Sequence, residues 1–219
     1  SEISRINRKR VRLGLSEFEP DFDQADVDGV LSLMKAIPYD EKVPIAEGIV
    51  FRGREAGHAL GSISIELTLS AFGKEKVVVF SGDLGPDALA VLKDSHPFTH
   101  ADLVIMESTY GDHDHKSLQE TLREGGEIIR NYLKKKGKIL VPSFALGRTQ
   151  QILFYLARAI DRGQLPELEV YLDSPMAIEA TRIYLKYPEL FDAEMNELYD
   201  SGVIKGDLSR IHTTESSEE

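Results

Sequence analysis

The stretch Ser62-Ile-Ser-Ile-Glu-Leu-Thr-Leu69 alternates polar and apolar residues along its whole length. This period of two predicts a half-buried β-strand. Two short apolar runs, 76–80 and 102–106, are bounded by turn residues and predict buried strands. Because these strands follow one another without helices between them, we expect an antiparallel or mixed sheet rather than a doubly wound one.

The pattern changes near residue 112, where helices begin to alternate with strands. Ser117-Leu-Gln-Glu120 is a capping box, which predicts the start of a helix. The later predicted elements are a strand at 138–141, a helix from Gly147 to about Ile160, a strand at 169–172 and a helix with Pro175 as its first residue. This order predicts a parallel α/β arrangement, so we place a domain boundary near residue 112.

The two ends of the chain carry weaker patterns. Residues 1–24 are polar, with a basic start and an acidic continuation, and predict a connecting segment that is poorly ordered or packed on something outside this chain. Asp23 is a plausible N-cap for a helix with an apolar stripe that ends before Pro38. The tail 209–219 is polar, and the chain contains no internal repeat.

Composition limits the function classes. With 219 residues, 42% of them hydrophobic, the chain can bury a core, and the absence of cysteine excludes disulfides and thiolate chemistry. No apolar run approaches the ~20 residues of a membrane span, so we expect no membrane partner and a cytoplasmic location. The net charge of −11 argues against indiscriminate coating of nucleic acid, but a locally cationic or metal-bearing cleft could still take a phosphate-bearing substrate.

Three predicted strands end in turns of small residues, and each turn carries one functional group. These groups are the imidazole of His58 and the carboxylates of Asp83 and Glu107. Imidazole and carboxylate are ligand types for zinc or manganese, and the flanking glycines allow close backbone approach. Taken singly, each turn also fits an ordinary hydrogen-bonded turn.

Taken together, five collinear motifs resemble the β-CASP branch of the metallo-β-lactamase superfamily. More narrowly, the chain is similar to bacterial and archaeal RNA-processing nucleases related to the mRNA 3′-end cleavage endonuclease. The resemblance covers about residues 25–195, and its motifs are His58-Ala-Leu-Gly-Ser62, Ser81-Gly-Asp-Leu-Gly85, Glu107-Ser-Thr-Tyr-Gly111, Pro142-Ser-Phe-Ala-Leu-Gly-Arg-Thr-Gln150 and Leu172-Asp-Ser-Pro-Met-Ala177.

The resemblance implies an α/β fold in two parts. Residues 1–111 would form part of a metallo-β-lactamase αβ/βα sandwich, and 112–219 part of the inserted α/β β-CASP cap, with substrate entering between them. It implies that His58 binds one metal ion, that Asp83 bridges two zinc ions, and that the acidic Glu107 takes part in proton transfer. The expected activity is zinc-dependent hydrolysis of RNA phosphodiester bonds, in which two cations ~3.5–4 Å apart activate water.

The family's main metal-binding string, His-x-His-x-Asp-His, does not occur in this sequence, and neither do the family's later histidine ligands. Catalytic zinc typically uses about three protein ligands plus water, so we expect the isolated chain to be inactive. The alternative is a non-catalytic structural or RNA-binding member, or fragment, of the same family. His113-Asp114-His115 looks like part of the missing string but is followed by Lys-Ser, so a solvated loop or a substrate-facing role for His115 is favoured.

The segment Pro142–Gln150 predicts a strand, a tight turn at Gly147 and a helix start. Free N–H groups at a helix N-terminus attract anions, and the guanidinium of Arg148 suits phosphate oxygens. We therefore expect Ser143 and Arg148 to contact phosphate, although Arg148 could instead pair with an acidic neighbour. By resemblance the partner is RNA, expected to be single-stranded, and the protein could be a homodimer or a subunit of a processing complex.

Overall fold

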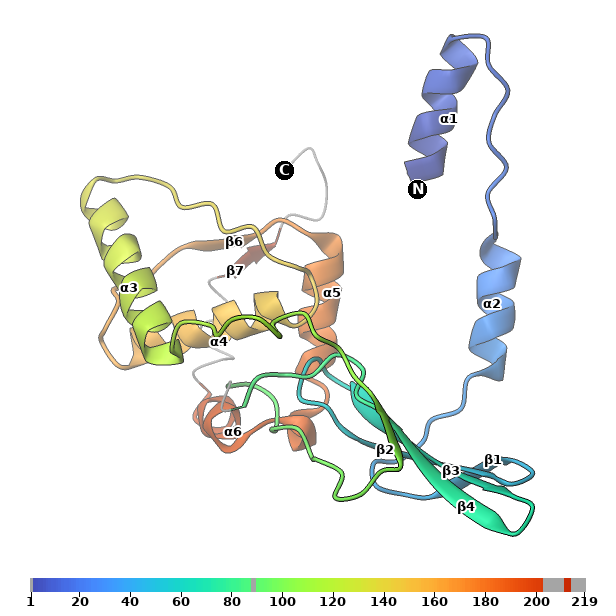
Figure 1. Ribbon diagram of the computed structural model, residues 1–219. Coiled ribbons are helices and arrows are strands. Elements are labelled where there is room, and N and C mark those ends of the chain that lie inside the picture. The colour runs from blue at the N-terminus through green and yellow to red at the C-terminus, as the bar shows by residue number, and fades with distance from the viewer. Residues whose placement is uncertain (1, 88–89, 203–210, 214–219) are drawn as a thin grey trace. The chain divides into compact units, whose positions relative to one another are not determined.

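The structure is a computed structural model that describes residues 2–87, 90–202 and 211–213. Contacts within the chain divide it into two units, Ser1–Pro38 and Tyr39–Glu219. In the described part of the chain, no helix combines the length and the apolar character that crossing a membrane requires. The predicted α/β class is confirmed, since the second unit combines a mixed sheet with a set of helices (Figure 1).

The first unit contains two helices, α1 (Glu2–Arg12) and α2 (Gln24–Leu33). The predicted capping role of Asp23 is confirmed, because its side chain accepts hydrogen bonds from the N–H groups of Ala25 and Asp26. Helix α1 was not predicted, since residues 1–24 were expected to be a connecting segment, either poorly ordered or packed on something outside this chain. It ends in a Schellman arrangement in which Gly14 has φ +70° and the N–H of Leu15 donates to the carbonyl of Arg10.

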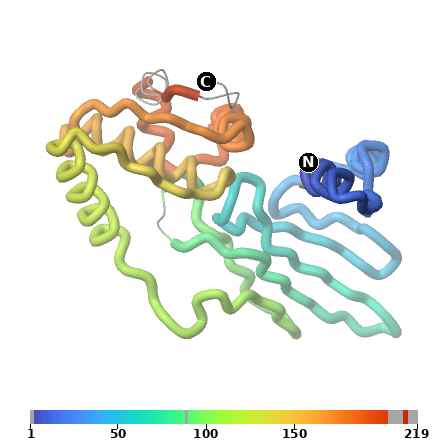
Figure 2. The backbone as a smooth tube through the Cα atoms, turned by 90° about the horizontal axis from the view of Figure 1, so that it is seen from above, coloured from blue at the N-terminus to red at the C-terminus, as the bar shows by residue number. Residues whose placement is uncertain are grey.

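The second unit begins with a five-stranded sheet of order β1-β2-β3-β4-β5. The strands are β1 (Val43–Ala46), β2 (Ile49–Glu55), β3 (Ile63–Ala71), β4 (Lys74–Phe80) and β5 (Leu103–Ile105). Strands β1 to β4 pair antiparallel and run back and forth side by side, while β5 pairs parallel to β4 (Figure 2). The mixed sheet expected from the sequence is therefore confirmed.

Burial within this sheet differs from the expectation in two places. On β3 the buried side chains are polar: Ser64 donates to the carbonyl of Ser81, and Glu66 pairs with Arg52 at 2.6 Å. Strand β5 was predicted to be buried, but its three residues are about half exposed. Strand β5 is an edge of the sheet, and no described element adds a further strand beside it.

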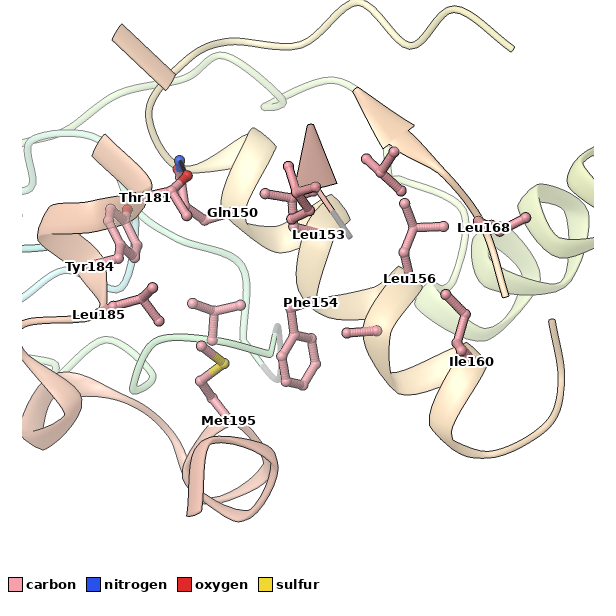
Figure 3. A pocket seen from close by; sticks show the side chains of 14 residues that line it. Gln150, Leu153, Phe154, Leu156, Ile160, Leu168, Thr181, Tyr184, Leu185 and Met195 are labelled. Atoms are coloured by element: carbon pink, nitrogen blue, oxygen red, sulfur yellow. Dashed lines mark hydrogen bonds between the residues drawn. The ribbon is translucent and has the colours of Figure 1, made fainter. Parts of the chain in front are cut away.

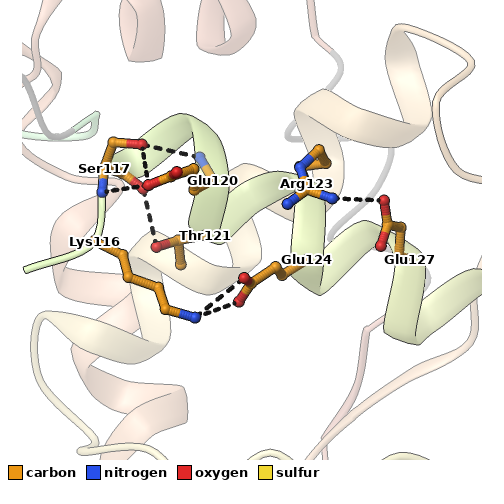
Figure 4. Close-up of polar contacts among 7 residues, drawn as sticks. All are labelled: Lys116, Ser117, Glu120, Thr121, Arg123, Glu124 and Glu127. Carbon is orange, nitrogen blue, oxygen red and sulfur yellow. Dashed lines mark hydrogen bonds and ion pairs between the residues drawn. The ribbon is translucent and has the colours of Figure 1, made fainter.

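The later part of the second unit is mainly helical. Its elements are α3 (Leu118–Lys134), α4 (Arg148–Asp161), β6 (Val170–Leu172), α5 (Pro175–Tyr184), the 3₁₀ turn η1 (Pro188–Leu190), α6 (Ala193–Asp200) and β7 (Ile211–Thr213). Strands β6 and β7 pair in parallel. The predicted capping box is confirmed, because Ser117 and Glu120 bond each other's backbone N–H groups (Figure 4). Pro175 is also the first residue of its helix, as predicted.

One prediction for this part is wrong. Residues 138–141 form no strand, and Leu140 is 92% exposed, because the described residues offer this apolar run no neighbouring strand to pair with. No secondary structure was predicted for the polar tail, in which residues 211–213 form β7. The rest of that tail, 209–210 and 214–219, lies outside the described residues.

The main core lies among α4, α5, α6 and the segment that precedes β5. Its buried members are Ala90, Val91, Leu92, Phe154, Tyr184, Phe191 and Met195. Leu153, Phe154 and Leu156 of α4 line a mostly apolar cavity with Leu185, which follows α5, and Met195 of α6 (Figure 3). The core draws residues from both sides of the boundary placed near residue 112, and that boundary stays a prediction.

Candidate functional site

Three functional turns leave the same edge of the five-stranded sheet. Strands β2 and β4 are both antiparallel to β3, so they run in the same direction, and β5 runs parallel to β4. The carboxyl ends of these three strands therefore lie on one side of the sheet. His58 follows β2, Asp83 follows β4 and Glu107 follows β5.

The turns bring an imidazole and a carboxylate together. His58 Nε2 lies 3.9 Å from Asp83 Oδ2, and both side chains are well exposed, at 50% and 76%. The two groups are therefore open to solvent and to a ligand. The sequence predicted that these two side chains approach each other, and the structure places them as expected.

The His58 turn is held by its own polar residues. The hydroxyl oxygen of Ser62 accepts hydrogen bonds from the N–H groups of His58 and Ala59, at 3.2 and 3.1 Å. Gly57 has φ +67° and donates to the carboxylate of Glu55. A Cβ on Gly85 would lie 2.0 Å from the carbonyl oxygen of Gly57, so only glycine permits this close approach of the two turns.

Glu107 lies beside this pair and is fixed at both oxygens. Its Oε1 accepts a hydrogen bond from the N–H of Leu84 at 2.8 Å, and its Oε2 accepts one from the hydroxyl of Thr109 at 2.7 Å. These bonds, the Leu84 bond first, lower the pKa of Glu107, and the nearby His58 imidazole adds to the effect when it is protonated. Glu107 is thus ionised at neutral pH and can accept a proton.

The donor atoms of His58 and Asp83 lie within reach of one divalent cation. Metal bonds of about 2.0–2.2 Å from each donor can span the observed separation of 3.9 Å. Within the described ranges, however, no group of three or more histidine, aspartate or glutamate side chains is placed to hold a metal ion. The pair is therefore a partial ligand set.

The start of α4 lies next to the His58 turn. Gly147, with φ +79°, is the N-cap residue, and a Cβ built on it would lie 3.6 Å from the carbonyl oxygen of His58. The sequence predicted free N–H groups at this helix start. Those of Arg148 and Thr149 are not free, because they donate to carbonyls of the preceding turn. Ser143 Oγ lies 2.8 Å from Thr149 Oγ1. Arg148 is exposed and forms no ion pair with any residue that the structure describes, so the alternative of an acidic neighbour is not supported.

His115 lies in the linker between Glu107 and α3. Its ring contacts are with Tyr110 and His113, which lie in the same linker. Sequence reasoning missed Ser62, Thr109 and Tyr184 as residues that position the site. Ser62 and Thr109 could have been found from the sequence, because they follow His58 and Glu107 within a few residues. No sequence signal points to Tyr184, because it is remote from the site in the sequence. Its hydroxyl accepts a hydrogen bond from the N–H of Leu60.

The comparison with known proteins agrees with this arrangement. Residues 149–219 match the Beta-Casp domain family. The chain is 36% identical over 184 residues to the ribonuclease TTHA0252 of Thermus thermophilus, covering 84% of this chain and 41% of that protein. It is 31% identical over 192 residues to an RNase J-like protein of Methanocaldococcus jannaschii, covering 84% of this chain and 44% of that one.

A third relative is eukaryotic. The chain is 27% identical over 181 residues to cleavage and polyadenylation specificity factor subunit 3 of Dictyostelium discoideum, covering 82% of this chain and 23% of that protein. This chain thus spans less than half the length of these curated relatives.

Proposed function

We propose that this chain, which belongs to the β-CASP branch of the metallo-β-lactamase superfamily, supplies part of the active site of a metal-dependent hydrolase of RNA phosphodiester bonds. The observation that carries the proposal is the approach of His58 to Asp83, at 3.9 Å, next to the ionised Glu107. The similarity to a ribonuclease and to an RNase J-like protein supports RNA as the substrate.

His58 and Asp83 are the proposed metal ligands. The family implies metal ions, and zinc is the ion that we propose, because an imidazole nitrogen and a carboxylate oxygen are common zinc ligands. When bound, the metal supplies a polarised water and neutralises charge on the phosphate. The exposure of both side chains leaves the metal face open to a large substrate.

Glu107 is the proposed proton acceptor. The N–H of Leu84 and the hydroxyl of Thr109 hold its carboxylate in one orientation and keep it ionised. A carboxylate held in this way can take a proton from an attacking water without first losing one of its own.

Ser143 and Arg148 are the proposed phosphate contacts, and His115 is proposed to face the substrate. The guanidinium of Arg148 carries no ion pair with the described residues and starts a helix beside the His58 turn. Its fork of donors suits phosphate oxygens. Single-stranded RNA as the substrate, a cytoplasmic location, and assembly as a homodimer or processing-complex subunit remain predictions.

A second candidate function is a non-catalytic RNA-binding or structural role. The observation that favours it is the partial ligand set, since the described residues hold no cluster of three potential ligands. Under this alternative the protein binds RNA but neither holds zinc nor cleaves the RNA.

Zinc titration of the purified chain tests the assignment of ligands. We expect weak binding that disappears in His58→Ala and in Asp83→Ala and persists in the matched control His113→Ala. Loss of zinc binding in His113→Ala, with retention in Asp83→Ala, would refute the assignment.

Cleavage of single-stranded RNA tests the activity. In an RNA-cleaving polypeptide that carries this sequence, we expect Asp83→Ala to lower the rate by at least about 100-fold, because even outer-shell partners of a metal cost 10- to 100-fold. A fully active Asp83→Ala variant contradicts the proposed mechanism.

A further inference from the structure

Three rings cluster in the linker between Glu107 and α3. The ring centroids of Tyr110 and His115 lie 3.9 Å apart with a tilt of 56°, and that of His113 lies 5.3 Å from Tyr110. All three side chains are exposed, and Tyr110 remains 55% accessible in spite of its two neighbours. The cluster therefore presents aromatic surface to solvent, and none of its three residues belongs to the hydrophobic core.

The linker that carries these rings is fixed at both ends. At its start, the N–H of Gly111 donates to the carbonyl of Ser108 at 3.1 Å. At its end, the ammonium group of Lys116 binds both carboxylate oxygens of Glu124, at 3.0 and 2.9 Å, just before the capping box of Ser117. Figure 4 shows these contacts at the start of α3. Anchored rings lose less conformational freedom when a ligand stacks on them.

The charges around the rings disfavour direct contact of the rings with a phosphate group. Asp112 lies against His113, with 2.5 Å between its Oδ1 and the ring Nδ1, and Asp114 is exposed between the two histidines. Carboxylates at this position repel phosphate. A planar, uncharged group remains compatible, because aromatic faces stack on bases of any sequence.

We propose that Tyr110 and His115 form a stacking platform for one nucleobase of a single-stranded RNA. The platform follows Glu107 closely in sequence, so a base held there places the adjoining backbone near the candidate site. This inference rests on the proposed function and extends it, because it names Tyr110 as a substrate-binding residue and the base, not the phosphate, as the group bound.

Tryptophan fluorescence tests the platform directly. The chain contains no tryptophan, so Tyr110→Trp introduces a single reporter. The matched control is Tyr171→Trp, because Tyr171 is also an exposed tyrosine that stacks on a histidine, His212, at 4.7 Å. Titration with a short single-stranded oligoadenylate should quench the tryptophan at position 110 and leave the one at position 171 unchanged.

Binding affinity supplies the second measurement. We expect Tyr110→Ala to bind the same oligoadenylate about 5- to 150-fold more weakly, the range observed when a base-stacking aromatic residue is removed, while Tyr110→Phe and Tyr171→Ala bind like the wild type. An oligonucleotide of the same length without bases should bind wild type and Tyr110→Ala equally. Circular dichroism of each variant checks that it is folded.

The outcomes separate this inference from the proposed function. If wild type binds the RNA but Tyr110→Ala binds equally well and the fluorescence of Tyr110→Trp is not quenched, the platform is wrong and the proposed function stands. Equal quenching of the Tyr110→Trp and Tyr171→Trp variants also overturns the platform, since it indicates non-specific contact. If the wild type binds no RNA with or without zinc, both the platform and the RNA-binding part of the proposed function are wrong.

Discussion

The helical region from α4 to α6 and the sheet from β1 to β5 are built in different ways. The helices enclose large apolar side chains such as Phe154 and Phe191, which are almost fully buried. In the sheet, by contrast, Val79 is a rare buried apolar side chain, and β5 leaves its apolar residues half exposed. Burial of apolar area therefore stabilises the helical region, while backbone pairing and polar contacts hold the sheet.

The candidate site depends on both regions. Its functional groups stand on turns of the weakly buried sheet, but the His58 turn is attached to the helical core. Leu60, two residues after His58, packs against that core, and its N–H donates to the hydroxyl of Tyr184 at 3.0 Å. The core of the helices therefore holds the turn of the sheet that carries His58.

The largest effect is expected from emptying the helical core. Phe191 is 1% exposed, so Phe191→Ala should lower the free energy of unfolding by about 3–5 kcal/mol. Phe144→Ala is the matched control, because Phe144 is 85% exposed and its removal should change stability by no more than about 0.5 kcal/mol. Urea denaturation measures both, and equal losses in the two variants would contradict the claim that burial of large apolar side chains stabilises the helical region.

A smaller loss is expected from cutting the link between the regions. Tyr184→Phe removes the acceptor of the part-buried Leu60 N–H and should cost about 0.5–1.5 kcal/mol, the usual net contribution of one hydrogen bond. Amide hydrogen exchange should become faster at Leu60 than the loss of global stability alone explains. Exchange of the amides within α5 should change only by as much as global stability changes. Unchanged exchange at Leu60 means that the link does not hold the turn.

The same residue gives a dependence on pH. Burial raises the pKa of Tyr184 above its usual value, and nearby Glu55 adds to the effect. The folded state therefore binds this proton more tightly than the unfolded state does, so the contribution is complete below about pH 10 and is lost as the pH rises above it. Tyr184→Phe should reduce the fall of stability between neutral and alkaline pH, as measured by denaturation at each pH.

Local signals in the sequence predicted the elements whose starts are determined by residues close by in the sequence. Ser117 with Glu120, Asp23 with Asp26, and Pro175 each mark a helix start through neighbours within one turn. The strands of the hairpin β3–β4 were predicted in the same way. The approach of His58 and Asp83 was predictable too, because strand direction alone sends both turns to one edge.

Elements that depend on distant neighbours were not predictable. The apolar run 138–141 reads as a strand, but a strand needs a partner, and the described residues supply none. The prediction that β5 is buried was wrong for the same reason. Strand β5 is the edge of the sheet, and its burial would need a further element packed beside it. The bond from Leu60 to Tyr184 joins residues that no local pattern connects.

Helix α3 provides a further prediction, because it has no buried residue and yet is the longest helix described. Its stability is therefore expected to come from its cap and from surface pairs such as Arg123 with Glu127. Ser117→Ala should cost about 1 kcal/mol and fray the first turn, as seen by circular dichroism and by exchange of the Glu120 amide. Ser32→Ala, whose hydroxyl caps no helix start, is the control and should have little effect.

The smallest effect is expected at the hairpin turn of the sheet, and it is a gain. Phe72 and Gly73 form the two-residue turn between β3 and β4 with φ values of +52° and +69°, and Phe72 is fully exposed at 103%. A bulky residue in this left-handed region is strained, whereas asparagine tolerates it and Asn-Gly is the preferred pair for such a turn. Phe72→Asn should therefore raise the free energy of unfolding by about 0.5–1 kcal/mol. Phe72→Leu keeps the strain and buries nothing, so it should leave the melting temperature unchanged. A loss of stability in Phe72→Asn means that the exposed ring contributes contacts, and the sheet then relies on apolar packing more than its burial indicates.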